Sequence, residues 1–456
     1  MADAPDAPAA PADYAPTADT WDHVVRAVAH TDHLGAAAAL MRATRAHAHD
    51  AELLWLTRAV RGGEWGGTLL ACAAGRPDEA RVGEILAACP TPASRAELLA
   101  CGDRYDQTAL FRACDIRNEQ HEEVALALVE LLLGAGADPL APGRYRNTGH
   151  EFQPIHLAAR WSARLVQRLV QAGASIDSVI MQESTLGNAT GARTAVGVRM
   201  IPALVALGAR ETHGNRAMHV IAGSPVEGAP PADGDVAAAL TALVSVGCSL
   251  TQPNALGDTP LDIAASWGNA PVVRALLALG VAATTKSLAH AVKHPSVVRL
   301  LLAAGAPVGE LMTMTAGGVN ATPLMEAAYE AVLESVQVLL GAGASLVRRN
   351  ERGRTALMYS LLSKSTDAAA VLSVVGVLLA AGADVYARDL AGNSPLHHLA
   401  MHSHAQPWAA PAARLLLASG ADVSTANSAG VTPAAYVPAI AREGVLYRLL
   451  LEAAGA

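Results

Sequence analysis

A chain of 456 residues exceeds the usual size of a single compact domain, so one globular core is not the first expectation. Hydrophobic residues make up 52% of the chain but aromatic residues only 4%, so an interior built from Ala, Leu and Val favours packed helices over a β-sandwich or barrel. The net charge is −8 with acidic and basic residues mixed along the chain, which argues against the clustered basic surface of a nucleic-acid-binding protein.

The first 20 residues, MADAPDAPAAPADYAPTADT, are rich in Pro, Ala and Asp, which predicts a disordered tail. They have neither the cationic start nor the apolar run of a secretory signal, and no segment of the chain is apolar for long enough to cross a membrane. The five cysteines are odd in number and form no CxxC pair or zinc spacing. We therefore expect reduced thiols in a cytoplasmic protein, and the sequence leaves delivery into a host cell open.

Residues 21–66 carry apolar positions at helical spacing, which predicts a helical cap over the first repeat of the array described below. An alternative interpretation concerns HLGAAAALMRATRAHAHDAELLW at 33–55. Its short helical runs, which end in Asp-Ala-Glu-Leu-Leu-Trp, resemble a diverged F-box, although the opening Leu-Pro of that family is absent. Residues 21–60 are therefore a cap or an F-box-like segment.

A short phrase ending in glycine recurs along the chain, from LLLGAGAD at 131–138 to LLLEAAGA at 449–456. The mean spacing is about 35 residues, and one copy is shortened. The aligned glycines are Gly136, Gly173, Gly208, Gly247, Gly280, Gly305, Gly343, Gly382, Gly420 and Gly455.

A second phrase keeps phase with the first, as in QPIHLAA at 153–159 and DTPLDIAA at 258–265. TPLHxAA followed by VVxxLLxxGAD, repeated about ten times over residues 100–456, resembles the ankyrin repeat. The resemblance implies an all-α ankyrin-repeat solenoid of stacked helix-turn-helix units with projecting β-turn fingers. The copies around 184–210 and 287–306 look degenerate, and GGTLLACAA predicts that the array begins at Gly67 and spans 67–456.

The copy at 257–281, GDTPLDIAASWGNAPVVRALLALGV, shows how such a unit folds. Thr259 can cap the free N–H groups of a first helix, and Pro260 suits its first turn. Gly268 can end this helix in the left-handed conformation, and Gly280 can end a second, amphipathic helix in the same way. Because two such short helices cannot bury their apolar faces alone, neighbouring copies have to stack.

Three copies are lengthened between their two helices. SPVEGAPPADGD at 224–235 is dominated by Pro, Gly and acidic residues, which predicts a solvated loop. SKSTDAAA at 363–370 and HSHAQPWAAP at 402–411 lengthen later copies at the same place. Insertions on one side of a solenoid often shape a binding face.

The search for catalytic chemistry finds no complete motif. HEFQPIH at 150–156 has the wrong spacing for a zinc protease and contains Pro154, which interrupts a helix. The GAGAD phrases close helices instead of opening them, so they are not phosphate loops, and no GxSxG is present. We expect no enzyme and no cofactor.

A histidine cluster is the best metal candidate, but no carboxylate or cysteine completes a ligand set, so we predict no metal site. Its members are His397, His398, His402 and His404. The ankyrin resemblance gives His397 a structural role instead, in which the ring bonds the backbone of the neighbouring finger. His156 and His219 are its counterparts in other copies.

The resemblance implies that a partner protein binds on the concave face made by finger tips and first helices. Candidate contacts are the aromatic residues that follow the Ala-Ala pair near the exposed end of a first helix, although packing between copies would explain them equally well. The fingers GRYRNTG and VRRNERGR are basic and would meet an acidic partner, unless they are only solvated loops. The candidates are Trp161, Trp267, Tyr329, Arg144, Tyr145, Arg146, Arg348, Arg349, Arg352 and Arg354.

The sequence thus predicts a non-enzymatic, monomeric adaptor or scaffold that binds another protein and neither nucleic acid nor membrane. Two alternatives stay open. In the first, residues 21–60 bind the core of a ubiquitin ligase and the array selects the substrate. In the second, the protein is an effector or immunity-type protein that masks its partner.

Overall fold

The computed structural model describes most of the chain from residue 69 onward. The described ranges are 69–75, 79–88, 92–102, 105–116, 121–144, 150–180, 183–190, 195–211, 214–223, 231–313, 320–402, 406–438, 441 and 444–455. The tail predicted at 1–20 and the cap or F-box-like segment at 21–66 lie outside these residues. The chain divides into two compact units: unit 1 is Met1–Ala192 with Val196–Gly214, and unit 2 is Arg193–Ala195 with Asn215–Ala456.

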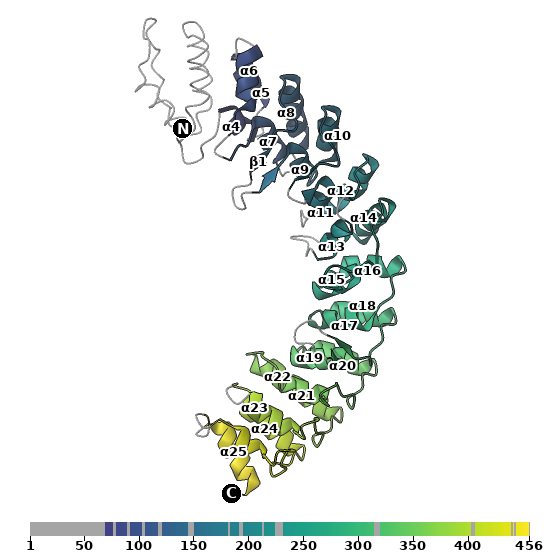
Figure 1. Ribbon diagram of the computed structural model, residues 1–456, viewed down its shortest axis with the longest axis vertical. Helices are drawn as coiled ribbons and strands as arrows, with labels where there is room; N and C mark the ends of the chain where they lie inside the picture. The colour runs from purple at the N-terminus through teal and green to yellow at the C-terminus, as the bar shows by residue number, and fades with distance from the viewer. Residues whose placement is uncertain are drawn as a thin grey trace, which may run out of the picture. The chain divides into compact units, whose positions relative to one another are not determined.

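The described residues of unit 1 form four helix pairs. They are α4 (Leu69–Gly75) with α5 (Glu79–Ala88), α7 (Ala109–Cys114) with α8 (Glu122–Gly134), α9 (Pro154–Ala158) with α10 (Ala163–Gln171), and α11 (Thr185–Thr190) with α12 (Ala195–Ala206). The first helices α4, α7, α9 and α11 contact one another in that order, and so do α5, α8 and α10 (Figure 1). A further helix, α6 (Pro92–Ala100), follows the first pair and precedes the second in the chain. The repeat pattern does not predict a helix there.

Unit 2 continues the same plan. The pairs are α13 (Arg216–Gly223) with α14 (Asp233–Ser245), α15 (Pro260–Ser266) with α16 (Ala270–Ala278), α17 (Thr285–His290) with α18 (Pro295–Ala303), α19 (Pro323–Tyr329) with α20 (Leu333–Gly341), α21 (Ala356–Ser360) with α22 (Ala368–Ala380), and α23 (Pro395–His402) with α24 (Ala409–Ala418). The short turns η3 (Ala291–Lys293) and η4 (Pro433–Tyr436) and the helix α25 (Val445–Ala454) complete it. Within each unit, the predicted all-α solenoid of stacked helix pairs is confirmed.

The strands of the described residues are two-residue hairpins in the fingers. They pair antiparallel as β1 (Gly143–Arg144) with β2 (Glu151–Phe152), β3 (Val179–Ile180) with β4 (Glu183–Ser184), and β5 (Met312–Thr313) with β6 (Asn320–Ala321). In the first hairpin, Gly143 lies opposite Phe152. These strands extend single fingers and form no larger sheet.

The helix boundaries follow the predicted punctuation. The Thr259 hydroxyl accepts a hydrogen bond from the Asp262 N–H at 3.2 Å, and the Asp262 carboxylate accepts one from the Thr259 N–H at 3.0 Å, which satisfies two donors at the start of α15. Every glycine of the recurring phrase has a positive φ, from 75° at Gly455 to 102° at Gly173. A side chain is strained in that region, so glycine ends each second helix there.

The two copies whose sequences look degenerate each form a helix pair. The copy at 287–306, which looked degenerate, is a complete pair whose first helix is capped by Thr284 and Ser287. Its period is short because its finger consists only of residues 281–284. In the other irregular copy, α12 contains Pro202 within the helix.

The lengthened connections are largely structured where the structure describes them. Asp233 and Asp235 belong to the first turn of α14, so the predicted loop at 224–235 ends earlier than expected. Asp367 caps α22, and α24 begins at Ala409. Trp408, at the end of the third connection, is fully buried. None of the described helices is long and apolar enough to cross a membrane.

Candidate partner-binding site

Four fingers of unit 2 share one repeated turn. In each of four fingers, the side-chain oxygen of an Asn or Asp accepts two backbone N–H groups of the same turn, at 2.8–3.0 Å. The acceptors are Asn254, Asn350, Asp389 and Asn427. Such side-chain-to-backbone bonds fix the turn without a strand partner, so the tip residues are presented on a rigid backbone.

Neighbouring fingers are also bonded to each other. The Leu390 N–H donates to the Arg352 carbonyl at 3.0 Å, and the Ser428 N–H donates to the Ala391 carbonyl at 3.1 Å. Arginine side chains make a second set of links: Arg349 donates to the Arg388 carbonyl at 2.6 Å, and Arg388 donates to the Ala426 carbonyl at 3.1 Å. The fingers 350–354, 389–393 and 427–431 are therefore a connected row.

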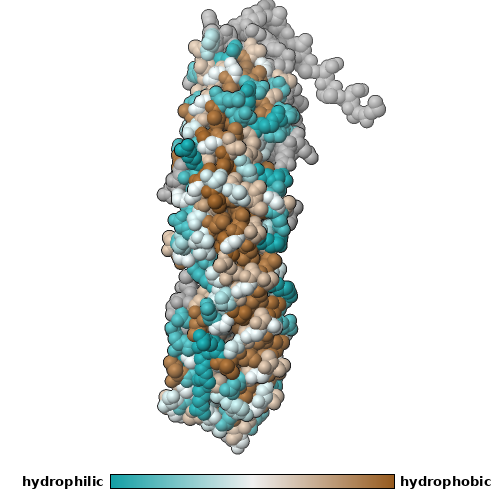
Figure 2. All heavy atoms as spheres, turned by 90° about the vertical axis from the view of Figure 1, so that its right-hand side faces the viewer, coloured by the Kyte–Doolittle hydropathy of each residue, from teal (hydrophilic) through white to brown (hydrophobic). Residues whose placement is uncertain are grey.

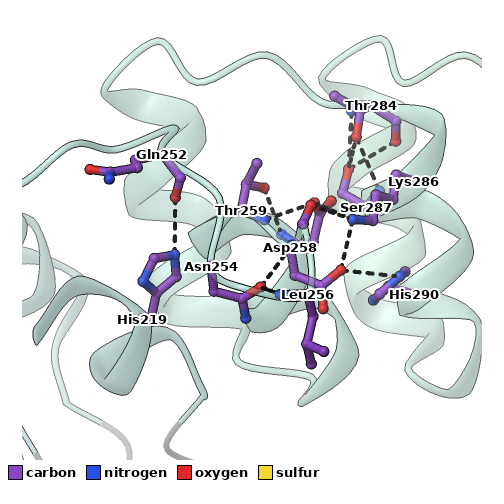
Figure 3. Close-up of polar contacts among 12 residues, drawn as sticks. His219, Gln252, Asn254, Leu256, Asp258, Thr259, Thr284, Lys286, Ser287 and His290 are labelled. Atoms are coloured by element: carbon purple, nitrogen blue, oxygen red, sulfur yellow. Dashed lines mark hydrogen bonds and ion pairs between the residues drawn. The ribbon is translucent and has the colours of Figure 1, made fainter. Parts of the chain in front are cut away.

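In three copies, a histidine of the first helix forms a hydrogen bond with the backbone of the finger that follows that copy. His219 Nε2 lies 3.0 Å from the Gln252 carbonyl (Figure 3), His397 Nε2 lies 2.9 Å from the Val431 carbonyl, and in unit 1 His156 Nε2 lies 3.0 Å from the Ser178 carbonyl. The structural role implied by the resemblance is confirmed.

The backbone fixes the tautomer of two of these rings. The Gln153 N–H donates to His156 Nδ1 at 3.0 Å, and the Ser394 N–H donates to His397 Nδ1 at 3.1 Å. Nδ1 is therefore unprotonated, and Nε2 carries the proton that is donated to the finger. Burial lowers the pKa of both histidines, so the neutral form is the one that belongs to the fold.

Lys286 anchors the finger that carries Leu256 (Figure 3). Its ammonium lies 2.7 Å from an oxygen of Asp258 and 3.7 Å from an oxygen of Asp262, and it donates to the Gly257 carbonyl at 2.6 Å. Both carboxylates are largely shielded from water, at 14% and 3% exposed. The cluster is a tether between two copies. Sequence reasoning missed it, although Lys286 is one of only three lysines in the chain.

The histidine cluster is not assembled as a metal site. His398 Nε2 lies 2.9 Å from an oxygen of Asp389, nine residues earlier in the chain. The same nine-residue link joins Asn350 to Tyr359 and Asn427 to Tyr436 in the adjacent copies, so His398 replaces a tyrosine in a structural bond. His402 ends α23, and His404 lies outside the described residues. Within the described part of the chain, no group of three ligating side chains could hold a metal ion.

The three candidate aromatic residues occupy different environments. Trp161 is buried, and its Nε1 donates to the Cys114 carbonyl at 2.9 Å, so the expected exposure was wrong and the packing alternative fits. Trp267 is 55% exposed and lies beside Gly223, where a Cβ would stand 3.5 Å from the indole Nε1. Tyr329 is half-buried at the end of α19.

The two basic fingers also differ. Arg144 of unit 1 pairs with Asp106 at 3.3 Å and with Glu151 at 3.5 Å, while Tyr145 and Arg146 lie outside the described residues. The unit 2 arginines Arg348, Arg349 and Arg352 are exposed and Arg354 is half-buried. None of these four has a carboxylate within ion-pair distance among the residues with described positions.

Exposed apolar side chains on the fingers of unit 2 were missed from the sequence. Leu390 is 77% exposed, Val347 73%, Leu256 72% and Tyr386 64%. The signal was present as a large apolar residue within three residues of the Asn or Asp that shapes the turn, where the repeat pattern requires none. We call the fingers of unit 2 the finger side.

A second apolar surface belongs to the second helices. Figure 2 faces the side on which α14, α16 and α18 lie in Figure 1, and apolar residues form a band along it. The last turns of these helices expose small or partly covered side chains such as Ala278 and Ala303. The larger ones are less exposed than the finger residues: Val244 is 42% exposed and Leu279 38%.

Family models match the repeats of unit 2. A model described as "Ankyrin repeats (3 copies)" matches residues 287–389, and the single ankyrin-repeat model matches 256–286 and 391–428. Neither is a catalytic family. Among solved structures, the ankyrin repeat domain of Bcl-3, titled a unique member of the IkappaB protein family, is 25% identical with a TM-score of 0.39, and the match covers 52% of this chain and 97% of that one. A search of curated proteins gave no match.

Proposed function

Because residues 256–428 of this chain are ankyrin repeats, a generally non-catalytic module of protein interaction, we propose that the protein is a scaffold that binds a partner protein with the finger side of unit 2. The fold supplies rigid positions, and function depends on which side chains those positions display. The F-box-like alternative rests on residues outside the described part of the chain.

The observation that carries the proposal is the placement of exposed apolar side chains. Unit 2 exposes eight large apolar side chains among its described residues, and four belong to the finger side. These four are Leu256, Val347, Tyr386 and Leu390, which are 64–77% exposed. Exposed apolar groups that gather on one side of a molecule mark interaction sites, and aromatic residues often anchor them. The bonded turns reduce the entropy that binding would otherwise cost.

The test compares two matched double variants. Leu256→Asp with Leu390→Asp places charge on the finger side, and Val244→Asp with Leu279→Asp places the same charge on the second helices. Each full chain is used for affinity capture from the source cell, after urea unfolding has shown that it remains folded. We expect the finger variant to lose at least one partner that the unchanged chain and the helix variant both retain.

Two results would contradict the proposal. Equal retention by both variants would place the contact elsewhere than on the finger side. Selective loss in the helix variant would assign binding to the apolar band of Figure 2.

A further inference from the structure

We propose that two adjacent fingers of unit 2, residues 344–355 and 383–394, form a receptor for an acidic, extended segment of the partner protein. This inference rests on the proposed function and specifies the chemistry of what is bound. We call the two fingers the arginine fingers. Their arginines are Arg348, Arg349, Arg352, Arg354 and Arg388.

The first observation is an unbalanced charge. The arginine fingers carry five arginines and three acids, within a chain whose net charge is −8. The three acids are engaged with amide groups: Glu351 lies 3.3 Å from Asn320 Nδ2, Asp384 accepts the Tyr386 N–H at 2.9 Å, and Asp389 shapes its own turn. No described carboxylate lies within ion-pair distance of the five guanidinium groups.

Two arginines on the second helices, Arg274 and Arg299, are paired instead. Arg274 lies 2.7 Å from Asp233, and Arg299 lies 2.5 Å from Glu334, in each case across two neighbouring copies. The fold therefore supplies carboxylate partners where arginine joins copies together. Among the described residues it supplies none on the arginine fingers, so the exposed charges there are available to a ligand.

The second observation is that the two fingers present a single surface. The Leu390 N–H bonds the Arg352 carbonyl, and Arg349 bonds the Arg388 carbonyl, so the two tips cannot separate without breaking both links. Arg349 and Arg388 each use one guanidinium nitrogen in such a link, which leaves further N–H donors free. The side chains of Arg348 and Arg352 make no hydrogen bond or ion pair within the described residues.

The neighbouring apolar groups identify the ligand as a protein segment. Val347, Tyr386 and Leu390 are 64–77% exposed beside the arginines, and they need apolar side chains to cover them. Guanidinium groups match carboxylates in paired hydrogen bonds. An extended peptide alternates its side chains between two faces, so it can place acidic groups on the arginines beside apolar groups on these residues. A nucleic acid would supply phosphates without aliphatic side chains, and the net charge of the chain would repel it.

The test measures binding of defined probes to the full chain by fluorescence anisotropy. The probes are a synthetic peptide in which Glu alternates with Leu, the same peptide with Gln in place of Glu, and a single-stranded oligothymidine. We expect the Glu peptide to bind at least about tenfold more tightly than the Gln peptide. The difference should shrink as salt is added, because exposed charges are screened.

The key variant is Arg348→Glu with Arg352→Glu, which changes two side chains that make no hydrogen bond or ion pair within the described residues. Its matched control is Arg414→Glu with Arg448→Glu, because these arginines are also exposed and unpaired in the described residues but lie on α24 and α25. We expect the first variant to weaken Glu-peptide binding by at least about tenfold and the control to leave it nearly unchanged. If the Glu variant fails to fold, Arg348→Gln with Arg352→Gln replaces it, with a smaller expected loss.

Three outcomes would overturn the inference: equal affinity for the Glu and Gln peptides, equal loss in the two charge-reversal variants, or tighter binding of oligothymidine with the same dependence on Arg348 and Arg352. The proposed function can survive such a result. If Leu256→Asp with Leu390→Asp still abolishes capture of a partner while Arg348→Glu with Arg352→Glu does not, the finger side binds a protein and the acidic segment is wrong.

Discussion

The two copies that carry the arginine fingers also have lengthened connections between their helices, at 363–370 and 402–411. The fingers and the connections both depart from the repeat pattern, but their side chains are buried to different extents. The connections turn inward: Trp408 is fully buried, and its Nε1 donates to the Ser365 carbonyl of the preceding connection at 3.0 Å. The fingers turn outward, with Leu390 77% exposed and Arg348 and Arg352 without side-chain partners among the described residues.

The difference teaches how a departure from a repeat pattern can be interpreted. An added side chain that finds its partner in the neighbouring copy becomes part of the fold, as Trp408 does with Ser365. An added charge that finds none remains available for binding. The binding face suggested by the insertions at 363–370 and 402–411 stays a prediction.

The largest expected effect comes from disrupting the buried contact between the two lengthened connections. Trp408→Ala removes a buried indole and its hydrogen bond, so we expect a loss of about 3–5 kcal/mol in the free energy of unfolding. Trp267→Ala is the control, because that side chain is 55% exposed and its removal should change stability by about 0.5 kcal/mol or less. Urea unfolding followed by circular dichroism measures both. Comparable losses in the two variants would show that Trp408 does not join the connections.

A smaller loss of stability is expected when the Lys286 tether of the finger that carries Leu256 is removed. Lys286→Ala leaves the shielded carboxylates of Asp258 and Asp262 without their cation, so we expect a loss of about 1–3 kcal/mol. Lys293→Ala removes an exposed ion pair with Glu330, which should cost about 1 kcal/mol or less. The same urea titration compares the two. If Lys293→Ala were the more damaging change, Lys286 would not be the anchor of its finger.

The smallest expected effect is the part of the pH dependence of stability that comes from the finger links. Burial lowers the pKa of His156 and His397 in the folded chain, so above about pH 6.5 both the folded and unfolded forms are neutral and stability does not change. As the pH falls below 6.5 the unfolded chain gains protons first, and each histidine lowers stability by at most about 1.4 kcal/mol per pH unit.

His397→Gln tests this origin. It should lower stability at pH 7, because the link to the Val431 carbonyl is weakened, yet reduce the further loss between pH 6.5 and 5.5. The cost of Trp408→Ala should be the same at both pH values, because that contact contains no titratable group. An unchanged pH profile in His397→Gln would show that other groups control acid sensitivity.

Most of the fold could be predicted from the sequence because its signals are local. Thr259 caps α15, and the recurring glycines take the left-handed conformation that their position requires. Trp161 and Trp267 show the limit. In both cases one residue separates the tryptophan from the preceding Ala-Ala pair. Trp161 donates a hydrogen bond to a carbonyl of the preceding copy, whereas Trp267 remains 55% exposed beside Gly223. The sequence around each tryptophan does not contain that difference.

The candidate site was only partly predictable for the same reason. Arg144 and Arg348 both stand in short basic runs, and the sequence treats them alike. In the structure, Asp106 and Glu151 neutralise Arg144, and one of these acids comes from a distant part of the chain. No comparable acid reaches Arg348 within the described residues.

The links between fingers have a consequence for where the chain can be cut. A fragment that stops at Gly420, where the repeat period ends, would remove the Val431 carbonyl that accepts from His397. It would also remove Asn427, whose side-chain amide donates to Asn393 at 2.8 Å. A boundary drawn by the sequence period therefore exposes broken bonds, and truncations should retain the finger that follows the last intact helix pair.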